Sequence, residues 1–368
     1  MRSVTRALRA ALAAAASVVL LAGCATAQPG DAATPTPEVD TRPLAELSLY
    51  ADPRAAEGPR TAVAGDEAIE PIAENPAQTL PASVVSHDPS GDKTMTVTDT
   101  SRVLALDLAG SLAATVWGLG LGDTLVGRDM TTTFPGTEDL PVVTSGAHAV
   151  NAESVLELRP TLILTDGSVG PRDVLEQLRE TGVTVVFIEN EASFEGAAQL
   201  ARDVATALGV PEVGEQLADR IASEIDDIRG QIDAIAPTDP ERKLRIVFLY
   251  LRGGSGIYYL FGPESGADHL IEGLGARDVA GEMGWEGMKP MTDEALVEAD
   301  PDVILVMTDG LASAGGVDGL LAAKPALALT TAGQQRRIVD MDDGEVLSFG
   351  PRTARVLDAL ARVLYAEP

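Results

Sequence analysis

From about residue 99 onward, apolar residues follow two different patterns along the chain. Runs of consecutive apolar residues predict buried strands, and apolar residues three or four positions apart predict amphipathic helices. The strands predicted first are Val103–Leu106, Thr161–Thr165 and Val183–Ile188, and the helices are Pro171–Glu180 and Phe194–Leu208. Strands that alternate with helices indicate an α/β fold.

A long amphipathic helix is predicted for Pro211–Ala236, which contains no internal proline. Six apolar residues recur in it at spacings of three and four: Leu217, Ile221, Ile225, Ile228, Ile232 and Ile235. This spacing places all six on one face of a helix, while acidic residues spread over the other faces. The helix therefore has one side suited to packing and one suited to solvent.

The α/β pattern returns after this helix, with strands at Leu244–Tyr250 and Val303–Met307 and helices at Ala267–Leu274 and Pro351–Tyr365. The run from Gly146 to Leu164 also matches the run from Gly287 to Leu305 at a constant offset of 141 residues. Two copies so far apart indicate two similar lobes. We expect two Rossmann-like lobes, residues 99–209 and 237–368, joined by the helix of residues 210–236, with the ligand in a cleft between them.

The N-terminus resembles a bacterial lipoprotein signal. Three arginines precede an apolar run, Ala10–Ala22, that is too short for a spanning helix, so residues 1–23 are predicted to be a secretory signal peptide. The single cysteine, Cys24, ends a Leu-Ala-Gly-Cys sequence that resembles a lipobox, in which the cysteine is lipidated. We expect lipidation of Cys24 to anchor the protein on the extracellular face of the cytoplasmic membrane.

Residues 24–98 lack sustained apolar periodicity. Ten of the 23 prolines and only one aromatic residue, Tyr50, lie between Gln28 and Thr94. This composition predicts a disordered tether, in which His87 is a solvated residue.

Composition excludes several classes of function. A formal net charge of −29 and an aromatic content of 4% argue against a nucleic-acid partner and against attraction to an anionic membrane surface. The chain also lacks a His-Glu-x-x-His motif, a nucleophile elbow, a phosphate-binding glycine loop and a usable thiol. We therefore expect no catalytic residues and no enzymatic activity.

Two residues suited to binding iron lie at predicted strand ends. His148 lies in the loop that opens the first repeat, where a neutral imidazole can offer one ring nitrogen to a metal. Tyr250 ends a strand, and Arg252, two residues later, points to the same side of an extended chain. A guanidinium beside a phenol favours the phenolate, which suits ferric iron. Taken singly, each residue also fits an ordinary structural role.

Together these features resemble the hemin-binding HmuT-type lipoproteins of haem importers, within the class of cobalamin, siderophore and haem binding proteins that have a rigid interlobe helix. The resemblance covers about residues 99–368 and rests on the lipobox, the repeat, the Gly-Ala-His loop and the sequence Tyr-Leu-Arg-Gly-Gly-Ser-Gly-Ile-Tyr-Tyr. It implies ferric haem as the transported ligand, with His148 and Tyr250 on the iron and Arg252 supporting the tyrosine. Further pocket candidates are Tyr258, Tyr259, Trp285 and Met307.

The resemblance also implies a membrane partner. Glu153 and Glu294 occupy matching places in the two repeats, and in this class such residues dock onto the permease of an ABC importer. A solvated glutamate that complements a helix dipole is the alternative.

Other cargoes and functions remain open at this point. A cobalamin or ferric-siderophore carrier would use the same lobes without axial ligation. A zinc or manganese carrier is poorly supplied, because the chain has three histidines in all. A secreted α/β enzyme would have to act in the same cleft without an assembled acid, base or nucleophile.

Overall fold

The computed structural model describes residues 40–65 and 68–368. The predicted signal peptide and Cys24 lie outside the described residues. The described residues belong to one compact unit.

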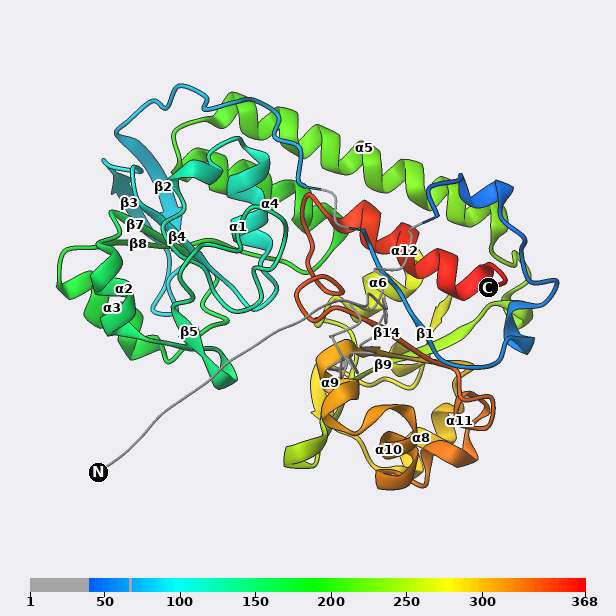
Figure 1. The fold of residues 1–368 in the computed structure, drawn as a ribbon. Coiled ribbons are helices and arrows are strands. Elements are labelled where there is room, and N and C mark those ends of the chain that lie inside the picture. The colour runs from blue at the N-terminus through cyan, green and yellow to red at the C-terminus, as the bar shows by residue number, and fades with distance from the viewer. Residues whose placement is uncertain (1–39, 66–67) are drawn as a thin grey trace, which may run out of the picture. The chain divides into compact units, whose positions relative to one another are not determined.

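The first sheet consists of three parallel strands in the order β4 (Val103–Leu106), β7 (Leu162–Thr165) and β8 (Thr184–Phe187). Its strands are buried on both faces, as their continuous apolar sequences require. Four helices flank it: α1 (Ser111–Gly118), α2 (Ala152–Leu158), α3 (Arg172–Glu180) and α4 (Phe194–Ala207). Side chains of α1 and α4 share one hydrophobic cluster with the sheet, and those of α2 and α3 share another, so the helices cover opposite faces (Figure 1).

The second sheet is mixed and has the order β1-β14-β13-β9-β10-β12, with β11 paired to β9. Its strands are β1 (Arg60–Thr61), β9 (Arg245–Arg252), β10 (Ile257–Phe261), β11 (Arg277–Asp278), β12 (Met288–Pro290), β13 (Val303–Met307) and β14 (Ile338–Met341). The pairs of β10 with β9 and β12 are antiparallel, and the others are parallel. The β9–β10 turn passes through Gly256, whose φ of 65° lies in the left-handed region that favours glycine.

Two groups of helices cover this second sheet. α6 (Ala267–Gly273) and α12 (Thr353–Tyr365) bury side chains in the same cluster as Ile246 and Phe248 of β9. The other face packs against α7 (Val279–Glu282), α8 (Asp293–Ala299), α9 (Thr308–Ser313), α10 (Gly316–Ala323) and α11 (Thr331–Gln334). Alternate residues of β9 therefore belong to different cores, which decides which side chains can share a site.

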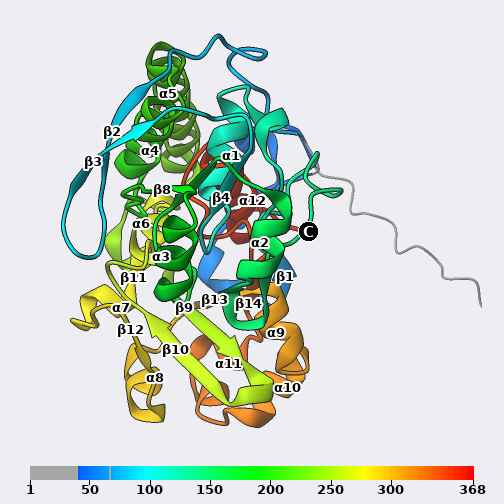
Figure 2. The same ribbon diagram turned by 90° about the vertical axis from the view of Figure 1, so that its left-hand side faces the viewer.

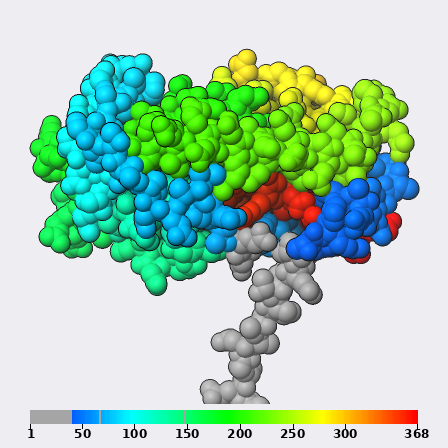
Figure 3. Space-filling model, turned by 90° about the horizontal axis from the view of Figure 1, so that it is seen from above, coloured from blue at the N-terminus to red at the C-terminus, as the bar shows by residue number. Residues whose placement is uncertain are grey.

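The predicted long helix is confirmed as α5 (Pro211–Ile235). It begins with proline at its first turn, where a missing N–H costs nothing, and buries the apolar face that its spacing predicts. α5 packs against α4 and α12, which cover the first and the second sheet (Figures 1 and 3).

The internal repeat is also confirmed. α2 and α8 begin and end at positions 141 residues apart, and each is capped by the side chain before it, Asn151 and Thr292. Each ends at a residue in the left-handed conformation, Arg159 and Asp300, before a buried parallel strand.

The prediction of a disordered tether is wrong for the described part of residues 24–98. β1 pairs with β14, while β2 (Ala82–Ser86) and β3 (Lys93–Val97) form an antiparallel hairpin (Figure 2). Leu44 and Val97 are fully buried, so packing onto the rest of the chain orders the segment. Two of the prolines, Pro43 and Pro53, are compatible with this order because they stand at the starts of short 3-10 turns, η1 (Leu44–Glu46) and η2 (Pro53–Ala55).

His87 follows the strand β2 and is not a free tail residue. Its backbone N–H donates to the carbonyl of Phe187, at the end of β8, at 2.8 Å. Its ring nitrogen Nδ1 lies 3.1 Å from a carboxylate oxygen of Asp92. The residue therefore has a structural place in the hairpin.

Candidate functional site

An aromatic row lies along one face of the β9–β10 hairpin. The Tyr250 ring is stacked on Phe261 at 5.7 Å between ring centroids, and Phe261 is stacked on Phe248 at 5.2 Å. Tyr259 pairs directly opposite Tyr250 in the strand register, and its ring centroid is 6.5 Å away. Tyr250 and Tyr259 are half-buried at the open end of the row.

Arg252 lies over the Tyr250 ring. Its guanidinium carbon is 4.8 Å from the ring centroid, and both terminal nitrogens are 3.4 Å from Oδ2 of Asp343. The same side chain donates to the carbonyl of Leu251 at 3.2 Å. Arg252 thus lies close to Tyr250, as the sequence predicts, and its guanidinium contacts the face of the tyrosine ring.

Asp343 follows β14 and was missed by sequence reasoning. Its Oδ1 accepts a hydrogen bond from the backbone N–H of Asp309, in the first turn of α9, at 2.9 Å. Burial raises the pKa of Asp343, while the hydrogen bond from Asp309 and the charge of Arg252 oppose that rise. The sequence does show a carboxylate just after a buried strand at this position. Many strands are followed by a carboxylate, so this pattern alone did not identify Asp343 as part of a site.

His148 lies at the end of a short 3-10 turn, η4 (Gly146–His148), between the strands β5 (Thr144–Ser145) and β6 (Ala149–Val150). Its φ of 55° is uncommon for a residue other than glycine, and such backbone strain is concentrated at functional sites. The ring is half-buried, and Nδ1 has no hydrogen-bond partner among the described residues.

Electrostatics connects His148 with the group around Arg252. Burial lowers the pKa of His148, and the positive charge of Arg252 lowers it further. The charges of Asp129 and Asp343 act in the opposite direction. Arg252 and Asp343 belong to the second sheet and its loops, so residues of that sheet act on His148. Because its pKa is lowered, the imidazole of His148 is neutral near pH 7.

The other predicted pocket residues divide between the two faces of the second sheet. Met307, at the end of β13, packs against the same cluster as Tyr250 and Tyr259. Tyr258 is buried in the opposite cluster beneath the Lys324 ammonium, and Trp285 packs there with its indole N–H donating to Leu260. The structure thus corrects the expectation that Tyr258 and Trp285 share a pocket with Tyr250. Strand alternation directs Tyr258 to the other face, and Trp285 packs on that face from the loop before β12.

Two exposed apolar side chains lie at the loops of the first sheet. Leu108 follows β4, Met130 lies in the loop that contacts β5, and each is 42% exposed. The buried carboxylate of Asp129 fixes the second loop by accepting hydrogen bonds from Thr131 and Thr132. Loops have no apolar periodicity, so sequence reasoning found neither residue.

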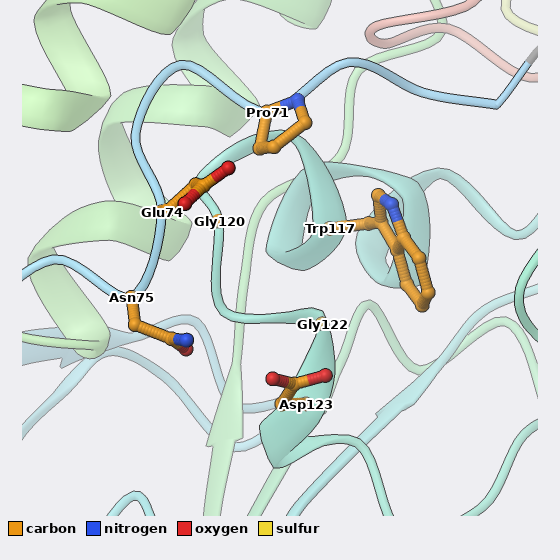
Figure 4. A pocket seen from close by; sticks show the side chains of 7 residues that line it. All are labelled: Pro71, Glu74, Asn75, Trp117, Gly120, Gly122 and Asp123. Carbon is orange, nitrogen blue, oxygen red and sulfur yellow. The ribbon is translucent and has the colours of Figure 1, made fainter.

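Two surface pockets lie away from this group. One is lined by Pro71, Glu74, Asn75, Trp117, Gly120, Gly122 and Asp123 (Figure 4). The other is lined by Lys243, Pro263, Asp268, Glu272, Ala276, Arg277, Asp278, Gly281 and Glu282. Neither includes a predicted ligand-binding residue. Within residues 40–65 and 68–368, no group of three or more His, Cys, Asp or Glu side chains is arranged to hold a metal ion.

The repeated helices α2 and α8 present matching surfaces. Glu153 and Glu294 are exposed in their first turns. One turn further, Leu156 and Val297 occupy matching positions and are each 42% exposed. Each helix thus carries an acidic and an apolar side chain on its surface, and sequence reasoning had found only the acidic pair.

A family model described as periplasmic binding protein matches residues 107–344. The chain belongs to the periplasmic binding protein family. Its members are binding components of transporters, which confirms the expectation that the chain is not an enzyme. No helix in the described part of this binding protein is long and apolar enough to cross a membrane.

Several individual proteins are similar to this chain over most of its length. The crystal structure of the heme binding protein HmuT is 40% identical with a TM-score of 0.80, and the match covers 86% of this chain and all of that one. The ABC transporter substrate-binding lipoprotein YvrC of Bacillus subtilis is 28% identical over 68% of this chain and 76% of its own. A cobalamin-binding protein of Halobacterium salinarum is 25% identical over 83% of this chain and 80% of its own. The resemblance to HmuT-type proteins is confirmed.

HmuT has also been solved with alanine in place of a histidine, of a tyrosine and of an arginine two residues after that tyrosine. Tyr250 and Arg252 have the same spacing in this chain.

Proposed function

We propose that this protein captures ferric haem outside the cell and delivers it to the permease of an ABC importer. The observation that carries the proposal is the contact of Arg252 with both the Tyr250 ring and the Asp343 carboxylate. His148, half-buried with an Nδ1 that has no hydrogen-bond partner among the described residues, adds a second candidate ligand. The similarity to HmuT, including its histidine, tyrosine and arginine variants, supports it.

Each side chain has a definite task in this proposal. His148, neutral near pH 7, offers a ring nitrogen to the iron, and Tyr250 offers its phenolate oxygen from the other side. Arg252 keeps positive charge beside the phenolate. Tyr259 and Met307 contact the macrocycle on the tyrosine side, while Leu108 and Met130 supply apolar surface on the histidine side.

The ligand cleft lies between the lobes of residues 99–209 and 237–368 in this proposal. The packing of α5 against α4 and α12 supports a rigid connection through residues 210–236. The loops that carry His148 and Asp343, and the strand end at Tyr250, then face the cleft from its two sides, as ligand sites of open α/β sheets do.

Hemin titration of the purified protein tests the proposed cargo. We expect a Soret band that remains on the protein after washing, with a phenolate-to-iron charge-transfer band, because ferric iron prefers a hard anionic oxygen. A preparation that retains cobalamin or a ferric siderophore and releases hemin on washing would contradict the proposal and favour the alternative carrier.

We further propose that the protein is lipidated at Cys24, after removal of residues 1–23, and docks on the permease through α2 and α8. The YvrC relative is a lipoprotein of an ABC transporter, which supports both points. The docking surface comprises Glu153 and Leu156 on one helix and Glu294 and Val297 on the other. Acidic residues steer the surface toward arginines of the permease, and the apolar neighbours exclude water from the contact.

Reversing both docking charges, Glu153→Lys with Glu294→Lys, is expected to lower haem uptake by about tenfold, since attraction becomes repulsion. The haem spectrum of the purified variant should be unchanged. Asp226→Lys with Asp227→Lys is the matched control, because it also reverses two exposed charges but lies on α5, outside the docking surface. Equal uptake by both double variants would return Glu153 and Glu294 to a solvated role.

A further inference from the structure

Arg252 is held from two sides. The aromatic ring of Tyr250 lies under the guanidinium, and the carboxylate of Asp343 contacts both terminal nitrogens through a single oxygen, Oδ2. Only 32% of the Arg252 side chain and 15% of the Asp343 side chain are exposed. The ion pair is therefore largely shielded from water. Charges in such a place interact more strongly than charges on an open surface.

The position of Asp343 is built into the fold. Its second oxygen, Oδ1, accepts the backbone N–H of Asp309 at 2.9 Å, which ties the carboxylate to the first turn of α9. Gly310 completes the arrangement, because a Cβ there would lie 2.9 Å from the carbonyl oxygen of Leu251 and 3.5 Å from a terminal nitrogen of Arg252. The first turn of α9 therefore fixes the Asp343 carboxylate through the N–H of Asp309, and the absence of a side chain at Gly310 leaves room for Arg252.

We propose that Asp343 is a positioning residue for haem binding, which acts as the counter-ion of Arg252 and sets both its pose and the net charge beside Tyr250. The inference rests on the proposed function. With Asp343 present, the guanidinium keeps its charge, but a carboxylate partly balances it while the guanidinium carbon lies 4.8 Å from the centroid of the tyrosine ring. The functional element is then the pair, and neither charge acts alone.

This assignment changes what loss of the arginine means. Arg252→Ala removes a cation and also leaves the Asp343 carboxylate unpaired in a shielded place, where an uncompensated charge is costly. The ligand brings further negative charge, since the phenolate and the porphyrin propionates are anionic. Part of the defect of Arg252→Ala should therefore come from Asp343. The other charged groups that bear on this carboxylate are Asp309 and Asp342, and the titratable imidazole of His148 is a further neighbour.

A double-mutant cycle tests the inference with four proteins: the wild type, Arg252→Ala, Asp343→Asn and the double variant. Hemin affinity is measured by competition with a haem-binding apoprotein, together with the pH at which the phenolate-to-iron band disappears on acidification. We expect the double variant to bind hemin about three- to tenfold more tightly than Arg252→Ala, the range for coupled charged neighbours. Its band should also persist to lower pH than in Arg252→Ala.

Asp342→Asn combined with Arg252→Ala is the matched control. It removes the same charge one residue away, but Asp342 is exposed and its Oδ1 accepts a hydrogen bond from Gly344. This control should restore neither affinity nor the band. Asparagine at position 343 keeps an oxygen for the N–H of Asp309, and Asp343→Ser provides a second variant should the first melt below the assay temperature.

The outcomes separate the two proposals. A wild type that does not retain hemin overturns the proposed function and this inference with it. A wild type with the tyrosinate spectrum whose variants behave additively, or whose double variant is weaker than Arg252→Ala, overturns the inference alone. Additive loss is what a merely structural role in capping α9 would produce.

Discussion

Tyr250→Ala is expected to eliminate the phenolate-to-iron charge-transfer band and to weaken hemin binding by at least about a hundredfold, because loss of an outer-shell partner alone costs roughly 10- to 100-fold. Absorption spectra and competition titrations measure both effects. Tyr258→Phe is the matched control. Tyr258 neighbours Tyr259 in sequence but lies on the other face of the sheet, so its variant should bind hemin like the wild type.

His148→Ala separates the two proposed ligands. Loss of the imidazole should leave a five-coordinate haem that keeps the tyrosinate band, with a smaller loss of affinity than Tyr250→Ala causes. If both alanine variants kept the wild-type spectrum, the axial assignment would fail. The cobalamin or siderophore alternative would then be favoured, since neither cargo needs these ligands.

Removal of residues 40–98 is expected to abolish cooperative folding, in contrast to their predicted role as a tether. Seven apolar residues of this segment are at least 91% buried: Leu44, Ala56, Ala62, Ile69, Ala82, Val84 and Val97. Burial of a large aliphatic side chain contributes about 1.5–3 kcal/mol, and a whole domain is stable by only about 5–15 kcal/mol. Deletion would also remove the strand β1 from β14 and expose a sheet edge.

Thermal and urea unfolding of residues 40–368 and 99–368 measure this difference. A finer pair of variants uses the same segment: Leu44→Ala should cost about 2–5 kcal/mol, whereas Val85→Ala, at a side chain that is 47% exposed, should cost under about 0.5 kcal/mol. Identical unfolding of the two chains would show that the segment contributes no stability despite its burial.

The regular elements were predictable because burial on two faces leaves a clear trace in the sequence. Val103–Leu106 and Val303–Met307 are strands at the predicted bounds, since a parallel strand between two layers of helices must be apolar throughout. The repeat added independent information, because α2 and α8 share their caps as well as their length.

The missed features depend on contacts between distant parts of the chain. β2 alternates buried and exposed residues over only five positions, which is too short a signal beside so many prolines. Tyr258 and Tyr259 are adjacent in sequence, and only the pairing of Tyr259 with Tyr250 tells which of them shares a face of the sheet with Tyr250. Asp343 is identified only by its contact with Arg252, which lies 91 residues away along the chain.

The folded segment before residue 99 also limits how far the binding protein can travel. With Cys24 acylated, as proposed, a tether through residue 98 would have let the protein search a wide radius from its lipid. The structure describes the folded body from residue 40, so the 16 residues from Cys24 can separate it from the anchor by no more than about 55 Å, their fully extended length. A connection of that length keeps α2 and α8 at a high effective concentration near a permease in the same membrane.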